Sequence, residues 1–186
     1  MCEKGSLSLL NQTVIPAIRK FKDFEKGIKS NHEYVVLLDV HLANLKSTIN
    51  MVHKEGKKVF VHADMIQGLK SDEQGTEFLC QEFHPDGIIS TRSNVLQTGK
   101  KKGVLVVQRL FLLDSMALST SYRLAEKAQP DYIEVLPGVI PELIQEVHRH
   151  TGIPIIAGGL IRDKQNVIGA LDAGATAVTT SNPELW

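Results

Sequence analysis

The feature that most constrains the fold of this chain is a single unit repeated along its length. Each unit has a short apolar run, a few polar residues, a helical stretch and a turn. The apolar runs are rich in β-branched residues, which is typical of strands, and the spacing leaves room for one helix and two loops. Eight runs can be distinguished, at 14–18, 35–38, 58–61, 87–89, 104–107, 132–135, 153–156 and 177–180. The repeat therefore predicts alternating strands and helices.

Residues typical of turns and helix caps support this division. A glycine follows four of the helical stretches, and glycine readily adopts the left-handed conformation that ends a helix. These glycines are Gly56, Gly103, Gly152 and Gly174. Helix starts are indicated by a capping box at 71–74, by Asp163 as a cap and by Pro141 in a first turn. The element boundaries are thus marked independently of the apolar runs.

Runs that are apolar on both faces are typical of parallel strands covered by helices. Two architectures satisfy this pattern, a closed barrel and an open, doubly wound sheet. Eight units favour a TIM-like (β/α)₈ barrel. The length of 186 residues fits one domain but is short for such a barrel, so its loops must be short. We therefore predict one small α/β barrel domain over residues 1–186.

Composition excludes several classes of protein. The 21 Lys and Arg residues balance the 21 Asp and Glu residues, which argues against a strongly polyanion-seeking protein but leaves room for a local basic patch. Two cysteines, Cys2 and Cys80, cannot build a disulfide framework and fit reduced thiols. No apolar run is long enough for a membrane span, and the first residues lack the pattern of a signal peptide. We expect a cytoplasmic protein without a membrane partner.

In barrels of this kind the working site lies at the carboxyl ends of the strands. The polar residues that close the apolar runs are therefore the candidates for function. They are Asp39, His62, Asp64, Ser90, Thr91, Gln108, Arg109, Glu134, Gly158, Gly159, Thr180, Ser181 and Asn182. All of them should converge on one mouth.

The last two units predict a phosphate site. Paired glycines let backbone N–H groups approach a ligand, and the loops after strands seven and eight are the usual phosphate site of this fold. The alternative is purely structural, with a tight turn at the glycines and Ser181 as a helix cap. We favour the phosphate site because both halves occur in the expected units. Its candidate residues are Gly158, Gly159, Leu160, Thr180, Ser181 and Asn182.

Two charged groups at the mouth each allow two interpretations. Arg109 ends a buried strand and needs a partner, which is either an acid such as Glu134 or Asp114 or an anionic ligand. His62 and Asp64 face the same way on a strand, as two metal ligands or an acid–base pair would. We favour a structural His–carboxylate pair, because no third ligand motif is evident. We therefore expect no metal and no catalytic residue.

Two further segments bear on partners. The loop at 64–70 carries apolar residues and is interpreted either as a lid over the mouth or as a plug that packs into it. Lys100, Lys101 and Lys102 form the only basic run. They end a helix, where positive charge suits the dipole, so a solvated helix end is favoured over contact with nucleic acid.

At these motifs the chain resembles the glycerol-3-phosphate-responsive antiterminator family of bacteria. The resemblance runs nearly from end to end and includes His62-Ala63-Asp64-Met65-Ile66-Gln67-Gly68-Leu69 and Ile156-Ala157-Gly158-Gly159-Leu160-Ile161. Further matches lie at 14–17, 22–25, 85–91, 108–111, 114–115, 133–138 and 180–186. The chain departs from the pattern at Gln67, where an acid is expected, and at Arg92, where lysine is common. Gln67 puts in doubt any role that needs a carboxylate in that loop.

The resemblance implies a regulator that binds glycerol-3-phosphate and acts on leader mRNA of glycerol uptake operons to prevent termination. The effector would be the only small molecule required, with no cofactor. The glycine loops fit its phosphate, and the remaining ligand-binding mouth would comprise Asp39, His62, Asp64, Thr91, Arg109, Glu134, Pro137 and Gly138. The RNA-binding face is unknown, with Lys100–Lys102 as weak candidates. A homodimer would join two modest patches into one larger RNA surface.

A second interpretation keeps the fold and changes the function. Because TIM-like barrels usually host enzymes, the same mouth would suit an aldolase, an isomerase or a glycerophosphodiesterase acting on a small phosphorylated substrate. Fold alone does not decide between these functions. No run ends in a lysine that would form a Schiff base, which favours the regulator.

Overall fold

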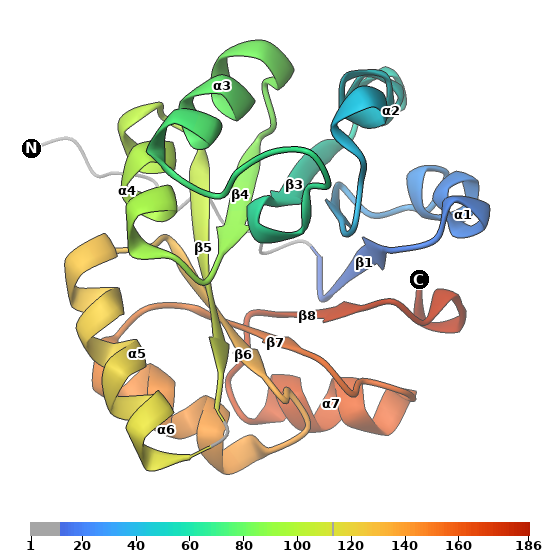
Figure 1. Ribbon diagram of the computed structural model, residues 1–186. Coiled ribbons are helices and arrows are strands. Elements are labelled where there is room, and N and C mark those ends of the chain that lie inside the picture. The colour runs from blue at the N-terminus through green and yellow to red at the C-terminus, as the bar shows by residue number, and fades with distance from the viewer. Residues whose placement is uncertain (1–11, 113) are drawn as a thin grey trace, which may run out of the picture.

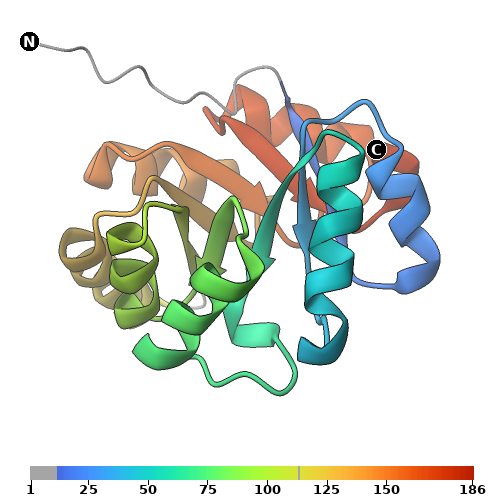
Figure 2. The ribbon, with the colours of Figure 1, turned by 90° about the horizontal axis from the view of Figure 1, so that it is seen from above.

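The computed structural model describes residues 12–112 and 114–186 and confirms the predicted closed barrel. Eight parallel strands pair in chain order, and β1 pairs with β8 to close the ring (Figures 1 and 2). The strands are β1 (Val14–Ile18), β2 (Tyr34–Leu37), β3 (Lys58–His62), β4 (Gly87–Ser90), β5 (Leu105–Phe111), β6 (Tyr132–Leu136), β7 (Ile155–Gly158) and β8 (Ala177–Thr180). All eight predicted runs therefore contain or overlap a strand.

Helices surround the strands, with α1 to α4 over the first half of the barrel and α5 to α7 over the second (Figure 1). The α-helices are α1 (Phe24–Ile28), α2 (Leu42–Lys54), α3 (Glu73–Phe83), α4 (Ser93–Lys101), α5 (Ser115–Ala128), α6 (Pro141–Thr151) and α7 (Lys164–Asp172). Three short 3₁₀ helices are η1 (Phe21–Asp23), η2 (Ala63–Met65) and η3 (Pro183–Leu185). No helix in the described part of the chain is both long and apolar enough to cross a bilayer.

Short elements explain how so few residues close a barrel. Helix α1 has five residues, and only Thr91 and Arg92 separate β4 from α4. The helix caps confirm two predictions, since Pro141 begins α6 and the Asp163 side chain accepts a hydrogen bond from the N–H of Asn166. The capping box at 71–74 was wrong by one residue. Asp72 caps α3 by accepting from the N–H of Gly75, because a carboxylate oxygen reaches that donor at 2.9 Å.

The core has an inner and an outer part because neighbouring residues of a strand face opposite sides of the sheet. On β3, Phe60 packs inside the barrel, whereas Val59 and Val61 pack outward beneath the helices. The same alternation turns His62 toward the interior at the carboxyl end of the strand. Cys80 is buried in the outer core, and burial raises the pKa of its thiol to about 11. The other cysteine, Cys2, lies outside the described residues.

The inner core is filled so closely that it dictates one glycine. Gly87 pairs with Phe60 across β3 and β4, and a Cβ atom at Gly87 would lie 2.1 Å from Cε1 of the Phe60 ring. Phe60 is 1% exposed, so its ring has no free space to move into. Gly169 in α7 differs, because a Cβ atom there would meet nothing within 4 Å.

We predict opposite effects for alanine at these two glycines. Gly87→Ala should lower the free energy of unfolding by about 1–3 kcal/mol, because it overpacks the barrel interior. Gly169→Ala should raise it by about 0.5–1 kcal/mol, because alanine loses less backbone entropy in a helix. Urea unfolding of both variants beside the wild type measures the two changes. A neutral Gly87→Ala would show that the interior is looser than these distances require.

Candidate functional site

A buried ion pair lies at the carboxyl ends of β5 and β6. Arg109 and Glu134 are register partners, and Nε of Arg109 donates to Oε2 of Glu134 at 2.6 Å. From β8, the Thr179 hydroxyl donates to the other carboxylate oxygen, Oε1, at 2.6 Å. The Arg109 and Glu134 side chains are 10% and 1% exposed. Of the two acids considered from the sequence, Glu134 is therefore the partner of Arg109.

This carboxylate explains why the last residue of β7 is a glycine. A Cβ atom at Gly158 would lie 2.7 Å from Oε1 of Glu134 and 2.6 Å from the Thr179 hydroxyl. Gly138 is equally confined, since its N–H donates to the Gly158 carbonyl at 2.6 Å and a Cβ atom would strike the backbone of β7. Close packing thus requires both glycines, Gly158 against the ion-pair network and Gly138 against the backbone of β7.

A cavity of about 130 Å³ opens above the ion pair. Pockets for drug-sized ligands are commonly about 300–1,000 Å³, so this one suits a much smaller molecule. Its lining combines loops after β1, β7 and β8 with the inner faces of β5 and β6. The lining residues are Ala17, Arg19, Leu38, Arg109, Glu134, Leu136, Gly159, Leu160, Ile161, Thr179, Thr180 and Ser181. Two arginines face one carboxylate here, so the formal charge of the lining is positive.

The cavity brings together part of the predicted site. From the phosphate set it contains Gly159, Leu160, Thr180 and Ser181, and from the mouth set it contains Arg109 and Glu134. The other predicted residues lie outside its lining. They are Asp39, His62, Asp64, Thr91, Pro137, Gly138, Gly158 and Asn182.

Among the lining residues, sequence reasoning missed two with polar side chains, Arg19 and Thr179. Arg19 directly follows β1, so the rule that selected residues closing a run would have found it had the first run been included. Thr179 lies inside the last run, and its inward direction follows from the alternation along β8. Arg19 is exposed and adds the second positive charge of the cavity.

The backbone beside the cavity is held in an uncommon conformation. Gly159 and Leu160 both have positive φ angles, 74° and 60°. Such a conformation is unfavourable for leucine, and strain of this kind is concentrated at functional sites. The loop is anchored to β8, because the Thr180 hydroxyl donates to the Ile161 carbonyl at 3.0 Å. The two loops predicted to hold phosphate are therefore joined directly.

Ser181 is not the helix cap that the structural alternative made it. The residue that caps η3 is Asn182, whose side-chain oxygen accepts from the N–H of Glu184 at 3.1 Å. The Asn182 amide nitrogen donates to the Arg162 carbonyl at 2.9 Å, so this side chain is engaged between the β7 and β8 loops. Ser181 is exposed and lines the cavity. The ring nitrogen of Trp186 donates to the Thr180 carbonyl, which fixes the end of the chain against the same strand.

The predicted pairing of His62 with Asp64 was wrong. Strand β3 ends at His62, and Asp64 lies in η2, where the chain has turned. The Asp64 carboxylate accepts from the Ser90 hydroxyl at 2.7 Å and from the backbone and hydroxyl of Thr91 at 2.8 and 2.9 Å. Asp64 therefore ties β3 to the start of α4. Both donors of Thr91, the backbone N–H and the hydroxyl, are thereby directed at Asp64.

His62 is left buried, and its Nδ1 atom has no hydrogen-bond partner within the described residues. Burial and, to a smaller extent, the nearby Arg109 charge lower the pKa of His62 to about 4, although Asp64 and Glu134 act in the opposite direction. The imidazole is therefore neutral at physiological pH. A neutral ring beneath the mouth retains one unpaired polar atom, and such atoms are rare inside proteins.

Of the two interpretations of the loop at 64–70, a lid or a plug, the contacts of its apolar residues favour the plug. Met65 packs against the barrel interior and Ile66 is buried in the outer core. Gln67 pairs through its backbone with Val40 and Leu42, and its side-chain nitrogen donates to Oδ1 of Asp39 at 2.7 Å. Gln67 thus binds a neighbouring carboxylate, which an acid at this position would repel.

The basic run at the end of α4 is largely engaged with the protein. The Lys100 ammonium donates to the Gln129 carbonyl, and the Lys102 ammonium forms an ion pair with Glu77 at 2.9 Å. This helix end lies at the amino-terminal face of the barrel, because α4 runs back from the carboxyl end of β4. The weak RNA-binding candidates Lys100, Lys101 and Lys102 are thus remote from the cavity.

Comparison with known proteins identifies the family. A sequence model described as glycerol-3-phosphate responsive antiterminator matches residues 14–186. The chain belongs to this family. A glycerol uptake operon antiterminator regulatory protein from Listeria monocytogenes is 46% identical, with a TM-score of 0.92 over 95% of each chain. The antiterminator family thus includes a solved structure that closely resembles this barrel.

Two further proteins are similar to this chain over nearly its whole length. An antiterminator-related protein from Thermotoga maritima is 29% identical, with a TM-score of 0.82 over 94% of this chain and 98% of that one. The uncharacterized protein YgcP of Escherichia coli is 30% identical over 97% of this chain and 95% of its own length. Solved aldolases also share the barrel, at 11–14% identity, and that likeness concerns the fold alone.

The buried histidine yields a prediction for the pH dependence of stability. The pKa of His62 is about 4 in the folded protein and about 6.5 in an unfolded chain. Its contribution to stability is therefore complete above pH 6.5 and is lost as the pH falls toward 4. Between pH 7.5 and pH 5 this residue should reduce the free energy of unfolding by roughly 2 kcal/mol.

Urea unfolding of the wild type and of His62→Gln at both pH values isolates this effect. Other titrating groups affect both proteins, so the difference between the two losses reports His62. The variant should lose about 2 kcal/mol less than the wild type over this interval. Equal losses would mean that the histidine is protonated, or paired, in the folded state.

Proposed function

We propose that this chain binds glycerol-3-phosphate in the cavity and, in that state, acts on a leader mRNA so that transcription continues through a terminator. The observation that carries the proposal is the small cavity between the β7 and β8 loops, whose two arginines outnumber its one carboxylate. A phosphate ester with a short polyol suits such a space. Membership of the antiterminator family supplies the regulatory outcome.

In this proposal the phosphate lies at the outer part of the cavity. Gly159 and Leu160 present backbone there, while Ser181 adds a hydroxyl. The Arg19 guanidinium supplies the opposite charge, and arginine is well suited to two-pronged binding of phosphate oxygens. Its long, exposed side chain lets this charge close over a bound ligand.

The glycerol hydroxyls are placed deeper, against the ion pair. Each oxygen of Glu134 already accepts one hydrogen bond, and a carboxylate oxygen accepts a second through its other lone pair. Arg109 uses its Nε–H for Glu134, and among residues 12–112 and 114–186 no partner occupies its terminal nitrogens. Those groups are preorganised to receive hydroxyl oxygens. Binding would thus require little rearrangement beneath the ligand.

The cavity chemistry also bears on the enzyme alternative. The lining contains no lysine for a Schiff base and no histidine for proton transfer. Its one carboxylate is neutralised by Arg109 and hydrogen-bonded by Thr179, which makes Glu134 a poor general base. Binding without turnover is the function that this set of residues favours.

Thermal unfolding tests whether glycerol-3-phosphate binds to the folded chain. Glycerol-3-phosphate at 100 times its Kd should stabilise the folded chain by about 2.7 kcal/mol. The melting temperature should rise by roughly 2–4 °C for each kcal/mol. Inorganic phosphate and glycerol should have much smaller effects. Ser181→Asp places a negative charge where phosphate binds, so it should abolish the shift. Asn50→Asp adds the same charge to the exposed face of α2 and should keep it. An undiminished shift in Ser181→Asp would overturn the location of the phosphate.

The second test concerns Arg19, which sequence reasoning had missed. Arg19→Gln removes a charge-assisted hydrogen bond worth about 1.5–3 kcal/mol, so affinity for glycerol-3-phosphate should fall by roughly 10- to 150-fold. Titration calorimetry of the wild type and the variant measures the change. Arg123→Gln on the exposed surface of α5 is the matched control and should bind as the wild type does. Unchanged affinity in Arg19→Gln would remove this arginine from the site.

A further inference from the structure

The segment that follows β1 combines positive charge with an exposed aromatic ring. Arg19, Lys20, Phe21 and Lys22 are four consecutive exposed residues. Phe21 is 81% exposed, although a large apolar side chain is normally buried. Neither the closure of the barrel nor the ligand cavity explains this ring.

Phe21 is held in a defined orientation. Its ring stacks on Phe24, with the centroids 5.9 Å apart and the planes 2° from parallel. Phe24 is buried in the outer core and therefore provides a fixed base for the stack. One face of the Phe21 ring lies against Phe24 and the other is available to solvent. An exposed, oriented ring of this kind is a platform for a nucleic-acid base.

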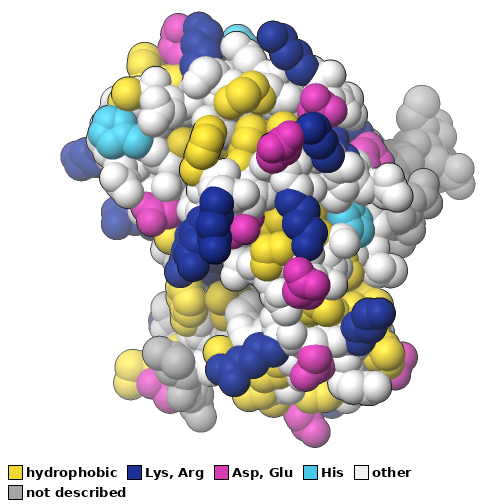
Figure 3. Space-filling model, turned by 90° about the vertical axis from the view of Figure 1, so that its right-hand side faces the viewer, with side chains coloured by type: hydrophobic (Ala, Val, Ile, Leu, Met, Phe, Trp, Pro, Cys, Tyr) yellow, Lys and Arg dark blue, Asp and Glu magenta, His cyan; other side chains and the backbone are white. Residues whose placement is uncertain are grey.

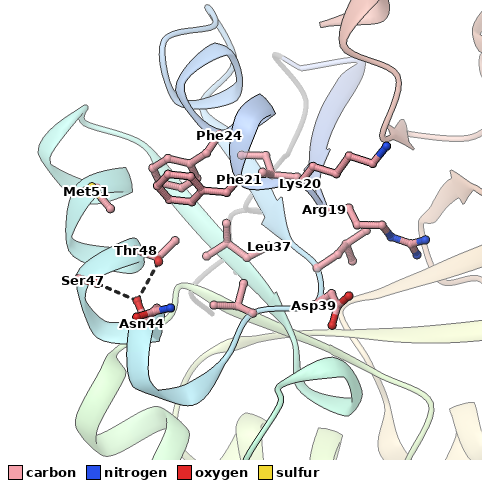
Figure 4. A pocket seen from close by; sticks show the side chains of 13 residues that line it. Arg19, Lys20, Phe21, Phe24, Leu37, Asp39, Asn44, Ser47, Thr48 and Met51 are labelled. Carbon is pink, nitrogen blue, oxygen red and sulfur yellow. Dashed lines mark hydrogen bonds between the residues drawn. The ribbon is translucent and has the colours of Figure 1, made fainter.

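A groove of about 420 Å³ lies beside this ring, between α1 and α2. Figure 4 shows Phe21 and Phe24 on one side of it and Met51 and Thr48 of α2 on the other. Asn44 and Ser47 add polar groups to the α2 side. The groove therefore offers apolar walls to the faces of a planar base and polar groups to its hydrogen-bonding edges.

The cations lie on the other side of the segment. In Figure 4 the Arg19 and Lys20 side chains point away from the aromatic pair, toward the side where Asp39 lies. Figure 3 shows Lys and Arg side chains on this face among hydrophobic and acidic ones. Within the described residues no ion pair involves Arg19, Lys20 or Lys22. These three charges are therefore available to phosphates.

Nearby lysines are less available. Lys26 forms an ion pair with Glu184 at 3.3 Å, and Lys29 forms one with Glu25 at 2.5 Å. Among the cations of β1, α1 and the turn between them, those without an ion pair in the described part of the chain are thus Arg19, Lys20 and Lys22, at the carboxyl end of β1. This placement differs from that of the lysine run on α4, which ends at the opposite face of the barrel.

We propose that the segment Arg19–Lys22 and the groove beside it, together called the β1–α1 surface, bind a single-stranded segment of RNA. Lys20 and Lys22 pair with backbone phosphates, and one base stacks on Phe21 and enters the groove. The inference rests on the proposed function and adds the location of its RNA partner. Single-stranded RNA fits better than a duplex, because only an unstacked base can place its face on the ring.

The surface also adjoins the ligand cavity. Arg19 lines both the cavity and the groove. A phosphate bound in the cavity attracts this arginine and fixes its position, and the neighbouring Lys20 and Phe21 are attached to the same short turn. Occupation of the cavity therefore has a direct physical route to the RNA surface.

Filter binding over a range of salt concentrations tests the β1–α1 surface. The probe is the leader transcript of the glycerol utilisation operon from the same genome, with saturating glycerol-3-phosphate. Phe21→Ala should weaken binding by roughly 5- to 150-fold, with an unchanged dependence on salt, because stacking is lost and no charge is removed. The double variant Lys20→Gln/Lys22→Gln should reduce the slope of log affinity against log salt by about 1.4, since each phosphate contact on a single strand contributes about 0.7.

Two control variants match these changes elsewhere. Phe78→Ala removes an exposed ring from α3, and Lys100→Gln/Lys101→Gln removes two charges from α4. Both should bind RNA as the wild type does. Every variant should retain the thermal shift with glycerol-3-phosphate, which shows that the fold and the ligand site are intact.

The outcomes separate the two proposals. If the wild type binds the transcript and both β1–α1 variants bind equally well, the location is wrong and the proposed function stands. If only the α4 double variant loses affinity, the RNA surface lies at the end of α4 and the inference is overturned. If the ligand-bound wild type does not bind the transcript, the RNA half of the proposed function fails and the inference fails with it.

Discussion

The mouth of this barrel is organised by the Arg109–Glu134 ion pair. Removing either member of a buried pair generally costs about 3–5 kcal/mol, because the other charge is left without compensation. Here Thr179 supplies a second hydrogen bond to the Glu134 carboxylate, so three strands contribute to one network. Gly158 must be a glycine to make room for that carboxylate. The Arg109 charge also helps to keep the nearby His62 neutral.

The site could be predicted from the sequence to the extent that it depends on strand ends. Alternation of short apolar runs and helical stretches predicted eight strands, and the closed barrel then placed Arg109, Glu134, Gly159 and Ser181 around one opening. The proposed ligand and the proposed RNA partner rest on the resemblance to a family. Neither could have come from periodicity, because a parallel barrel is compatible with many functions.

The failures have physical causes that periodicity does not contain. His62 and Asp64 were expected to pair because alternate residues of a strand share a face, but β3 ends at His62 and the following turn sends Asp64 to Thr91. The packing role of Gly158 was also not predicted, because it depends on the close approach of the Glu134 carboxylate. In each case the deciding contact joins segments far apart in the chain, and only the folded structure brings them together.

The position of Arg19 has a thermodynamic consequence for regulation. If one arginine contributes to both the cavity and the β1–α1 surface, the binding of ligand and the binding of RNA are linked. The factor by which the ligand strengthens RNA binding must then equal the factor by which RNA strengthens ligand binding. A regulator of this design does not need a large conformational change. It needs only that one side chain be ordered by the first partner, so that the entropy of ordering it is not lost again when the second partner binds. The short turn between β1 and α1 is suited to this, because its base is fixed by Phe24 in the core while its charged side chains remain exposed.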